Sequence, residues 1–160
     1  MRRSAARALL CLGWSTAPVA AQSRGVVLEW GVHSTVTAST AGPIGLVAGP
    51  RVALRSFGGT RVALSVGAGF RGDQASARGE AALEYVLTPR AAGRTSVYLG
   101  GGLAGAVGGG KGGYLMAYAG IERSPGLPAG WALEAGLGGG FRLRAAYHWR
   151  RFPRGWRPQK

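Results

Sequence analysis

Residues 131–152 have apolar side chains at every second position, in two runs separated by glycines 138–140. In the second run the apolar set is Phe141, Leu143, Ala145, Tyr147 and Trp149, and the set between them is Arg142, Arg144, Ala146, His148 and Arg150. A period of two on both sides of a glycine turn predicts an antiparallel hairpin. One apolar and one charged face fit a soluble sheet wetted on one side. They also fit barrel strands that face lipid outside and a polar lumen inside.

The same alternation recurs along the chain and predicts eight strands. We expect them at about residues 25–37, 43–56, 60–71, 77–88, 94–107, 111–123, 130–138 and 141–151. Turn signals separate these segments, and no segment has the sustained 3.6-residue apolar period of a helix. Each segment can hold the about 9–11 residues of a tilted transmembrane strand, and such barrels have an even number of strands. The predicted fold is therefore all-β, an eight-stranded antiparallel up-and-down transmembrane β-barrel.

Three details refine this prediction. Pro50 falls on the apolar face of the second strand, where its missing N–H predicts a bulge or a bend. The connections expected to face outside the cell are short, which argues against a receptor or adhesin surface built on loops. The 30 glycines in 160 residues are far above ordinary usage and suit a narrow wall that bends sharply.

The placement of charge favours a membrane barrel over a soluble sheet. Five of the six acidic residues fall on the polar face of a strand, and the chain has only two lysines, whereas a soluble sheet normally carries Lys and Glu on its wet face. Arg–Glu pairs suit a confined lumen because bidentate contacts satisfy both partners. Arg55, Arg78 and Glu122 share the polar phase. The predicted lumen charge network consists of Glu29, Arg51, Arg61, Glu80, Glu84, Glu134, Arg142 and Arg144. A soluble sandwich, whose apolar faces would pair as a core, remains an alternative.

The outward aromatic residues supply a second test of the membrane interpretation. Phe70 and Phe141 fall toward one end of the expected barrel, and a larger group falls toward the end that carries both termini. This predicted aromatic girdle consists of Trp30, Tyr85, Trp131, Tyr147 and Trp149. Aromatic girdles at both interfaces are typical of transmembrane barrels.

The N-terminal segment has the pattern of a secretory signal peptide. A basic beginning with three arginines precedes a short apolar core, and small residues stand before Gln22. We expect cleavage after Ala21, which would remove Cys11, the only cysteine of the chain. The predicted organisation is a signal peptide at 1–21, an outer-membrane β-barrel at 22–152 and a basic C-terminal tail at 153–160.

The positive charge has two interpretations. Removing three arginines with the signal peptide leaves 17 basic against six acidic residues, or +11, which could indicate nucleic-acid binding. The basic residues are however spread singly along strands, with a local run only near the C-terminus. We therefore expect no nucleic-acid partner, and we place the basic tail and turns near anionic lipid headgroups. A secreted soluble β-protein that binds an anionic polymer remains an alternative.

Residues 25–152 resemble, as a pattern, the small outer-membrane β-barrels of the OmpA/OmpX type. The most specific part is residues 143–149, which are similar to the closing strand recognised by the barrel-assembly machinery. Two departures from the family are that eight residues follow Phe152 and that Arg144 stands where the motif often has glycine. The resemblance implies a monomer in the outer membrane of a Gram-negative-type envelope. Its partners would be outer-membrane lipids and, during insertion, the assembly machinery.

Catalytic and cofactor motifs are weak. Glycine runs at 100–102 and 108–113 precede no helix, so they lack the geometry of a phosphate loop. His33-Ser34 with a strand glutamate is similar to the arrangement of an outer-membrane lipid deacylase. Adjacent strand residues, however, point to opposite faces, and His148 falls on the lumen side. No spacing predicts a metal site or a cofactor. The sequence thus predicts a non-enzymatic barrel with a structural or envelope role and a lumen closed by Arg/Glu pairs. At most it would be a narrow, anion-leaning channel, and a lipid-modifying enzyme stays as an alternative.

Overall fold

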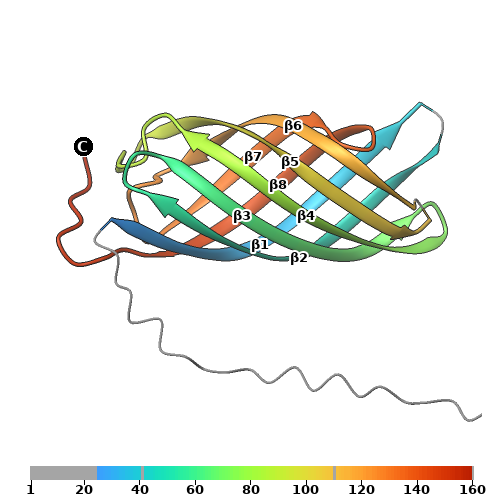
Figure 1. Ribbon diagram of the computed structural model, residues 1–160, viewed down its shortest axis with the longest axis horizontal. Coiled ribbons are helices and arrows are strands. Elements are labelled where there is room, and N and C mark those ends of the chain that lie inside the picture. Colours follow the sequence, from blue (N-terminus) through green and yellow to red (C-terminus); the bar gives the residue numbers. More distant parts are fainter. Residues whose placement is uncertain (1–24, 41, 110, 160) are drawn as a thin grey trace, which may run out of the picture.

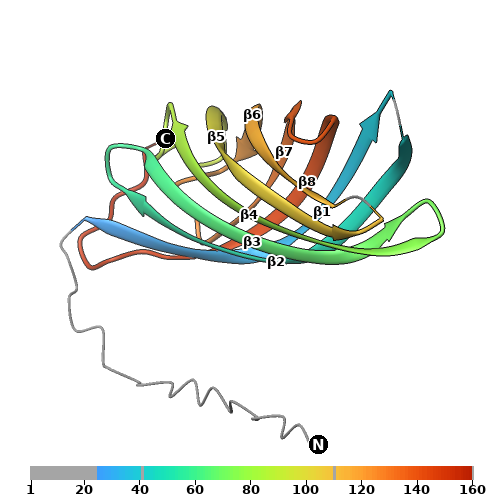
Figure 2. The ribbon, with the colours of Figure 1, turned by 45° about the vertical axis from the view of Figure 1, so that its right-hand side comes forward.

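The computed structural model describes residues 25–40, 42–109 and 111–159, which form a single sheet that closes on itself (Figures 1 and 2). The predicted signal peptide, its cleavage site and Cys11 lie outside the described residues. Neighbouring strands are antiparallel, and β1 pairs with β8 to complete the ring. The strands are β1 Val26–Ser39, β2 Gly42–Ser56, β3 Thr60–Arg71, β4 Gln74–Val86, β5 Thr95–Gly108, β6 Gly112–Arg123, β7 Ala129–Leu137 and β8 Phe141–Arg151. Within this described part, no helix is long and apolar enough to cross a membrane.

The predicted all-β, eight-stranded antiparallel barrel is confirmed, and the sandwich alternative is wrong because one sheet closes into a ring. The strand limits agree with prediction to within three residues. The largest difference is the start of β4, at Gln74 instead of residue 77. Gly72 has φ +61°, a left-handed conformation that glycine adopts without strain, and it lets the chain reverse within residues 72–73.

The barrel has its charges inside and its apolar side chains outside. Along β8, for example, Arg142, Arg144, His148 and Arg150 are buried, while the residues between them are exposed. Twenty-eight large apolar side chains keep 38–82% of their surface exposed, so the apolar wall extends around the whole ring. The leucines expected in the middle of the wall, Leu64 and Leu133, are among them. The interior of this molecule is therefore mainly polar, with a smaller buried apolar cluster that includes Val86 and Met116.

The two ends of the barrel differ. We call the end with the start of β1 and the end of β8 the terminus end, and the opposite end the distal end (Figure 1). The distal end carries the β1–β2, β3–β4, β5–β6 and β7–β8 connections, and the last three are two or three residues long. The terminus end carries connections at 57–59, 87–94 and 124–128, which include the longest one. Outer-membrane barrels have short turns at the end that carries both termini. The eight-residue connection at 87–94 departs from that pattern.

The segment after β8 does not extend freely from the barrel but folds against the terminus end. The Trp156 ring stacks on Phe152 at 4.5 Å and contacts Phe57 in the β2–β3 turn at 5.0 Å, both between ring centroids. Its indole N–H donates to the Gly126 carbonyl at 3.1 Å. Gln159 forms a parallel bridge with Ala91 in the β4–β5 connection. The tail is thus attached to all three connections at this end.

Pro50 does not cause the predicted bulge. The pairs Ala48↔Ala68 and Arg51↔Ser65 have the same register on either side of it, so only the pairing of residues 49–50 with β3 is interrupted. The gap is local because a lumen side chain satisfies the freed carbonyl of β3, as described below.

Candidate functional site

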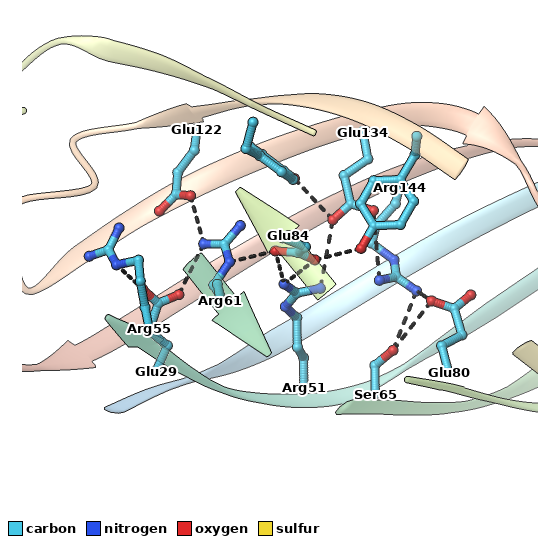
Figure 3. Close-up of polar contacts among 12 residues, drawn as sticks. Glu29, Arg51, Arg55, Arg61, Ser65, Glu80, Glu84, Glu122, Glu134 and Arg144 are labelled. Carbon is cyan, nitrogen blue, oxygen red and sulfur yellow. Dashed lines mark hydrogen bonds and ion pairs between the residues drawn. The ribbon is translucent and has the colours of Figure 1, made fainter. Parts of the chain in front are cut away.

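The lumen is filled by one network of ion pairs, and Glu84 on β4 lies at its centre. Arg51 Nη2 donates to both Glu84 oxygens, at 2.7 and 2.8 Å, and Arg61 Nε donates to Oε2. The hydroxyl of Tyr118 donates to Oε1 at 2.6 Å. This carboxylate therefore contacts two guanidinium groups and a phenol while its side chain is fully buried. Figure 3 shows Arg51 and Arg61 pointing toward Glu84 in the lumen.

Two further glutamates hold arginines toward the terminus end. Glu29 lies 2.9 Å from Arg55 Nε, 3.1 Å from Arg61 Nη1 and 3.6 Å from Arg150 Nε. Glu122 accepts from Arg61 Nη1 at 2.8 Å and from Arg150 Nη2. Arg61 on β3 thus contacts carboxylates from β1, β4 and β6, so a single guanidinium ties together strands that are not neighbours.

A second group lies toward the distal end. Glu80 pairs with Arg78 at 2.6 Å, with Arg142 at 3.5 Å and with Arg144. Glu134 pairs with Arg142 at 3.0 Å. Because Glu134 also lies 3.7 Å from Arg51, this group is continuous with the central one.

Every carboxylate of the network is paired within the lumen, but the network has more arginines than glutamates. Each of its five carboxylates contacts two or three guanidinium groups, because seven arginines share the five glutamates. Several buried donors, such as Arg51 Nε, Arg55 Nη1 and Arg61 Nη2, have no hydrogen-bond acceptor among the described residues. The lumen therefore has an excess of positive charge and of donors, which favours anions over cations within it.

Two tyrosines complete the packing of the lumen, each over a glycine of the adjacent strand. Tyr98 on β5 pairs with Gly120 on β6, and Tyr118 on β6 pairs with Gly100 on β5. A Cβ at Gly100 would lie 2.5 Å from the Tyr118 ring, and one at Gly120 would lie 2.4 Å from the Tyr98 ring. Each ring also receives an arginine on its face, Arg61 over Tyr98 and Arg142 over Tyr118, which is a cation–π contact. The glycines thus make room for aromatic rings that pack against the guanidinium groups of Arg61 and Arg142.

His33 repairs the gap that Pro50 leaves in the β2–β3 ladder. Pro50 lies opposite Val66 by register and has no N–H to give to the Val66 carbonyl. His33 Nε2 lies 3.2 Å from this oxygen and donates to it, while Nδ1 accepts from the Thr35 hydroxyl at 3.3 Å. Within the lumen the side chain passes its β2 pairing partner, Gly49, and reaches β3, where its Cε1 would lie 3.3 Å from a Cβ at Gly67. His33 therefore has a structural role in the lumen.

All eight residues predicted for the lumen charge network lie inside the barrel, and each makes at least one ion pair. Four charged members were left out of that prediction: Arg55, Arg78, Glu122 and Arg150. They have the same inward phase, so the alternation alone would have found them. The partner of each charge could not be found in this way, because it depends on the stagger of strands across the ring.

The five residues of the predicted aromatic girdle lie on the outer wall, 38–51% exposed. Trp30 pairs with Trp149 and Trp131 pairs with Tyr147, which brings four of them onto three adjacent strands. Tyr85 lies near the end of β4, at the same end of the barrel. Phe70 and Phe141 lie near the distal end.

The elements of the deacylase alternative are not brought together. Ser34 is exposed on the outer wall, between Ala48 and Ala145. His33 and His148 are both buried in the lumen. Nowhere in the described part of the chain do three or more His, Cys, Asp or Glu side chains form a group that could hold a metal ion.

Comparison of the chain with protein-family models, with curated proteins and with solved structures gives no match. Fold and site together define a closed eight-stranded β-barrel with a polar, ion-paired lumen and an apolar exterior.

Proposed function

We propose that this protein is a small outer-membrane β-barrel with a structural, envelope-stabilising role. Its lumen is closed by the Arg/Glu network and conducts at most as a narrow channel that favours anions. In this proposal the chain is exported through a cleaved signal peptide, is inserted by the barrel-assembly machinery and remains in the membrane as a monomer surrounded by lipid.

One observation carries the proposal: most large apolar side chains of every strand face outward, while all the strand carboxylates and most of the strand arginines face inward. The largest apolar patch on a soluble monomer is typically about 300–600 Å². A continuous wall of twenty-eight exposed large apolar side chains exceeds this and needs an apolar solvent. Strands of 9–15 residues match or exceed the about 9–11 residues that a tilted strand needs to cross a bilayer. A closed ring also leaves no unpaired strand edge facing lipid.

The packing of the lumen supports a structural role over an open pore. An eight-stranded barrel encloses a space that side chains can just fill. Here Arg51, Arg61, Glu84 and the two tyrosines meet across the centre of that space, and their side chains are fully or nearly fully buried. A solute would have to separate these ion pairs in order to pass.

Expression of the full chain in a Gram-negative host, followed by fractionation, tests the proposal. We expect the protein in the detergent-extractable outer-membrane fraction, resistant to a carbonate wash, and migrating differently in boiled and unboiled samples on a detergent gel. The closed barrel resists the detergent until it is heated, which produces this difference. Release by carbonate together with identical migration of the two samples would refute the proposal.

A further inference from the structure

We propose that the terminus end of the barrel is a binding surface for anionic phospholipid headgroups. The surface consists of Arg90, Arg94, Arg123, Arg151, Arg154 and Arg157. This inference rests on the proposed membrane location and adds to it the class of lipid and the end of the barrel that selects it.

The exterior charges are distributed very unevenly. Eight cationic side chains of the described residues lie outside the lumen, and six of them belong to the terminus end. The distal end has Arg71 and Lys111, together with the exposed Asp73. Arg94, Arg123, Arg151, Arg154 and Arg157 are exposed, and Arg90 is half-buried because its guanidinium covers the rings of Phe57 and Trp156.

No acidic side chain is available to neutralise these arginines. Five of the six acidic residues of the chain are buried in the lumen, where arginines of the interior already surround them. The sixth, Asp73, lies at the distal end. None of the six arginines of the terminus end forms an ion pair with a side-chain carboxylate of the described residues. The acidic side chains of the chain therefore provide no counter-charge for this surface.

The neighbouring residues identify that counter-charge as a lipid headgroup. Arg151 follows Trp149 by two positions on the outward face of β8, and Tyr147 packs against Trp149 at 5.1 Å between ring centroids. Arg123 follows Ile121 in the same way on β6. Trp and Tyr favour the headgroup level of a bilayer, and Arg side chains reach outward from the apolar zone to the same level. An arginine just beyond an aromatic residue on a lipid-facing wall is therefore placed at the phosphate layer.

The docked tail holds two further arginines at this level. The Trp156 contacts described above fix the tail, and its backbone is fixed by hydrogen bonds from Gln159 N to Arg90 O and from Ala92 N to Gln159 O, both 2.8 Å. Arg154 and Arg157 flank Trp156 and remain exposed. A folded segment presents these charges with a smaller loss of conformational entropy on binding than a free tail would.

Lipid selectivity can be measured directly on the full chain in phosphatidylcholine vesicles. Trace spin-labelled phosphatidylglycerol or phosphatidylcholine is added, and electron paramagnetic resonance gives the fraction of each lipid held at the protein surface. The terminus-end variant is Arg94→Gln/Arg123→Gln/Arg151→Gln/Arg154→Gln/Arg157→Gln, which replaces every exposed arginine of the surface, and the distal-end control is Arg71→Gln/Lys111→Gln. None of these residues belongs to the lumen network.

We expect the wild type to prefer phosphatidylglycerol by about fivefold, the factor that one arginine near an anionic surface supplies, and we expect the preference to fall with salt. The terminus-end variant should lose the preference and the distal-end variant should keep it. Equal association of both lipids with the wild type would overturn the inference, as would a preference that survives the terminus-end variant. Binding of heparin with no lipid preference would also overturn it, in favour of a soluble polyanion. Insertion into the uncharged vesicles, seen as a heat-modifiable gel band, is a separate readout whose failure counts against the membrane location itself.

Discussion

The ion-pair network makes Glu84→Gln the most informative single substitution. Gln keeps the shape of the side chain but removes the charge that Arg51 and Arg61 share. Arg51 then has only Glu134, at 3.7 Å, whereas Arg61 keeps Glu29 at 3.1 Å and Glu122 at 2.8 Å. Removing one partner of a buried ion pair costs about 3–5 kcal/mol. Because Arg61 retains two carboxylates, we expect a loss near the lower limit, about 3 kcal/mol.

Equilibrium unfolding by urea in lipid vesicles, read from the unboiled gel band, measures this loss. The control is Asp73→Asn, the same loss of one negative charge at an exposed turn, which should change stability by less than about 0.5 kcal/mol. A second variant, Arg51→Gln/Glu84→Gln, removes the stranded cation as well. Its loss of unfolding free energy should be smaller than the sum of the losses of the two single variants by about 1–3 kcal/mol, because the two residues are in contact. A Glu84→Gln protein as stable as Asp73→Asn, or strictly additive single variants, would refute the pairing argument.

Three further predictions concern the wall, its glycines and the lumen. Leu133→Arg, in the middle of β7, should lower the free energy of unfolding in lipid by about 2–4 kcal/mol. Leu137→Arg, at the end of the same strand, should lower it by at most about 1 kcal/mol, and equal losses would refute the membrane-facing assignment. Gly100→Ala should destabilise the barrel by about 1–3 kcal/mol because its Cβ would meet the Tyr118 ring at 2.5 Å, while Gly105→Ala, with open space around its Cβ, should be neutral or slightly stabilising in the same unfolding assay. In planar bilayers the wild type should show no large steady conductance and any small current should favour anions, so a stable open channel would show that the lumen is not closed.

Gly138 would be a poor control for the wall substitutions, although its place beside a turn predicts that it tolerates arginine. It is buried, its carbonyl accepts from Arg78 Nη2 at 2.9 Å, and a Cβ there would lie 2.9 Å from Met116 Cγ. From these contacts we expect Gly138→Arg to destabilise the barrel as well.

The sequence predicts the fold well because one physical requirement repeats in every strand. A strand whose two faces meet different environments needs apolar and polar side chains to alternate along the sequence. This alternation identifies Glu122 and Arg55 as lumen residues as readily as Glu29. It does not predict partners. Arg61 and Glu122 are 61 residues apart and meet across the lumen only because of the tilt and stagger of the strands. These are properties of the closed ring, which no single segment encodes.

Two other features depend on contacts that periodicity does not describe. The role of His33 follows from a missing N–H on the next strand, at Pro50, and from a carbonyl on the strand beyond it, at Val66. Tyr98 and Tyr118 are placed by the pairing of each with a glycine on the adjacent strand. A search for inward glycines opposite inward aromatic residues would find both tyrosines once the register was known.

The attachment of the tail has a consequence for the order in which the molecule forms. Its contacts come from Phe57, from the β4–β5 connection and from Gly126, which belong to three different hairpin connections. These surfaces are adjacent only after the ring has formed, so the tail docks last, and each contact it makes opposes the reopening of the barrel. Protection of residues 153–159 from proteolysis is then a property of the finished ring alone, and its onset marks the moment of closure.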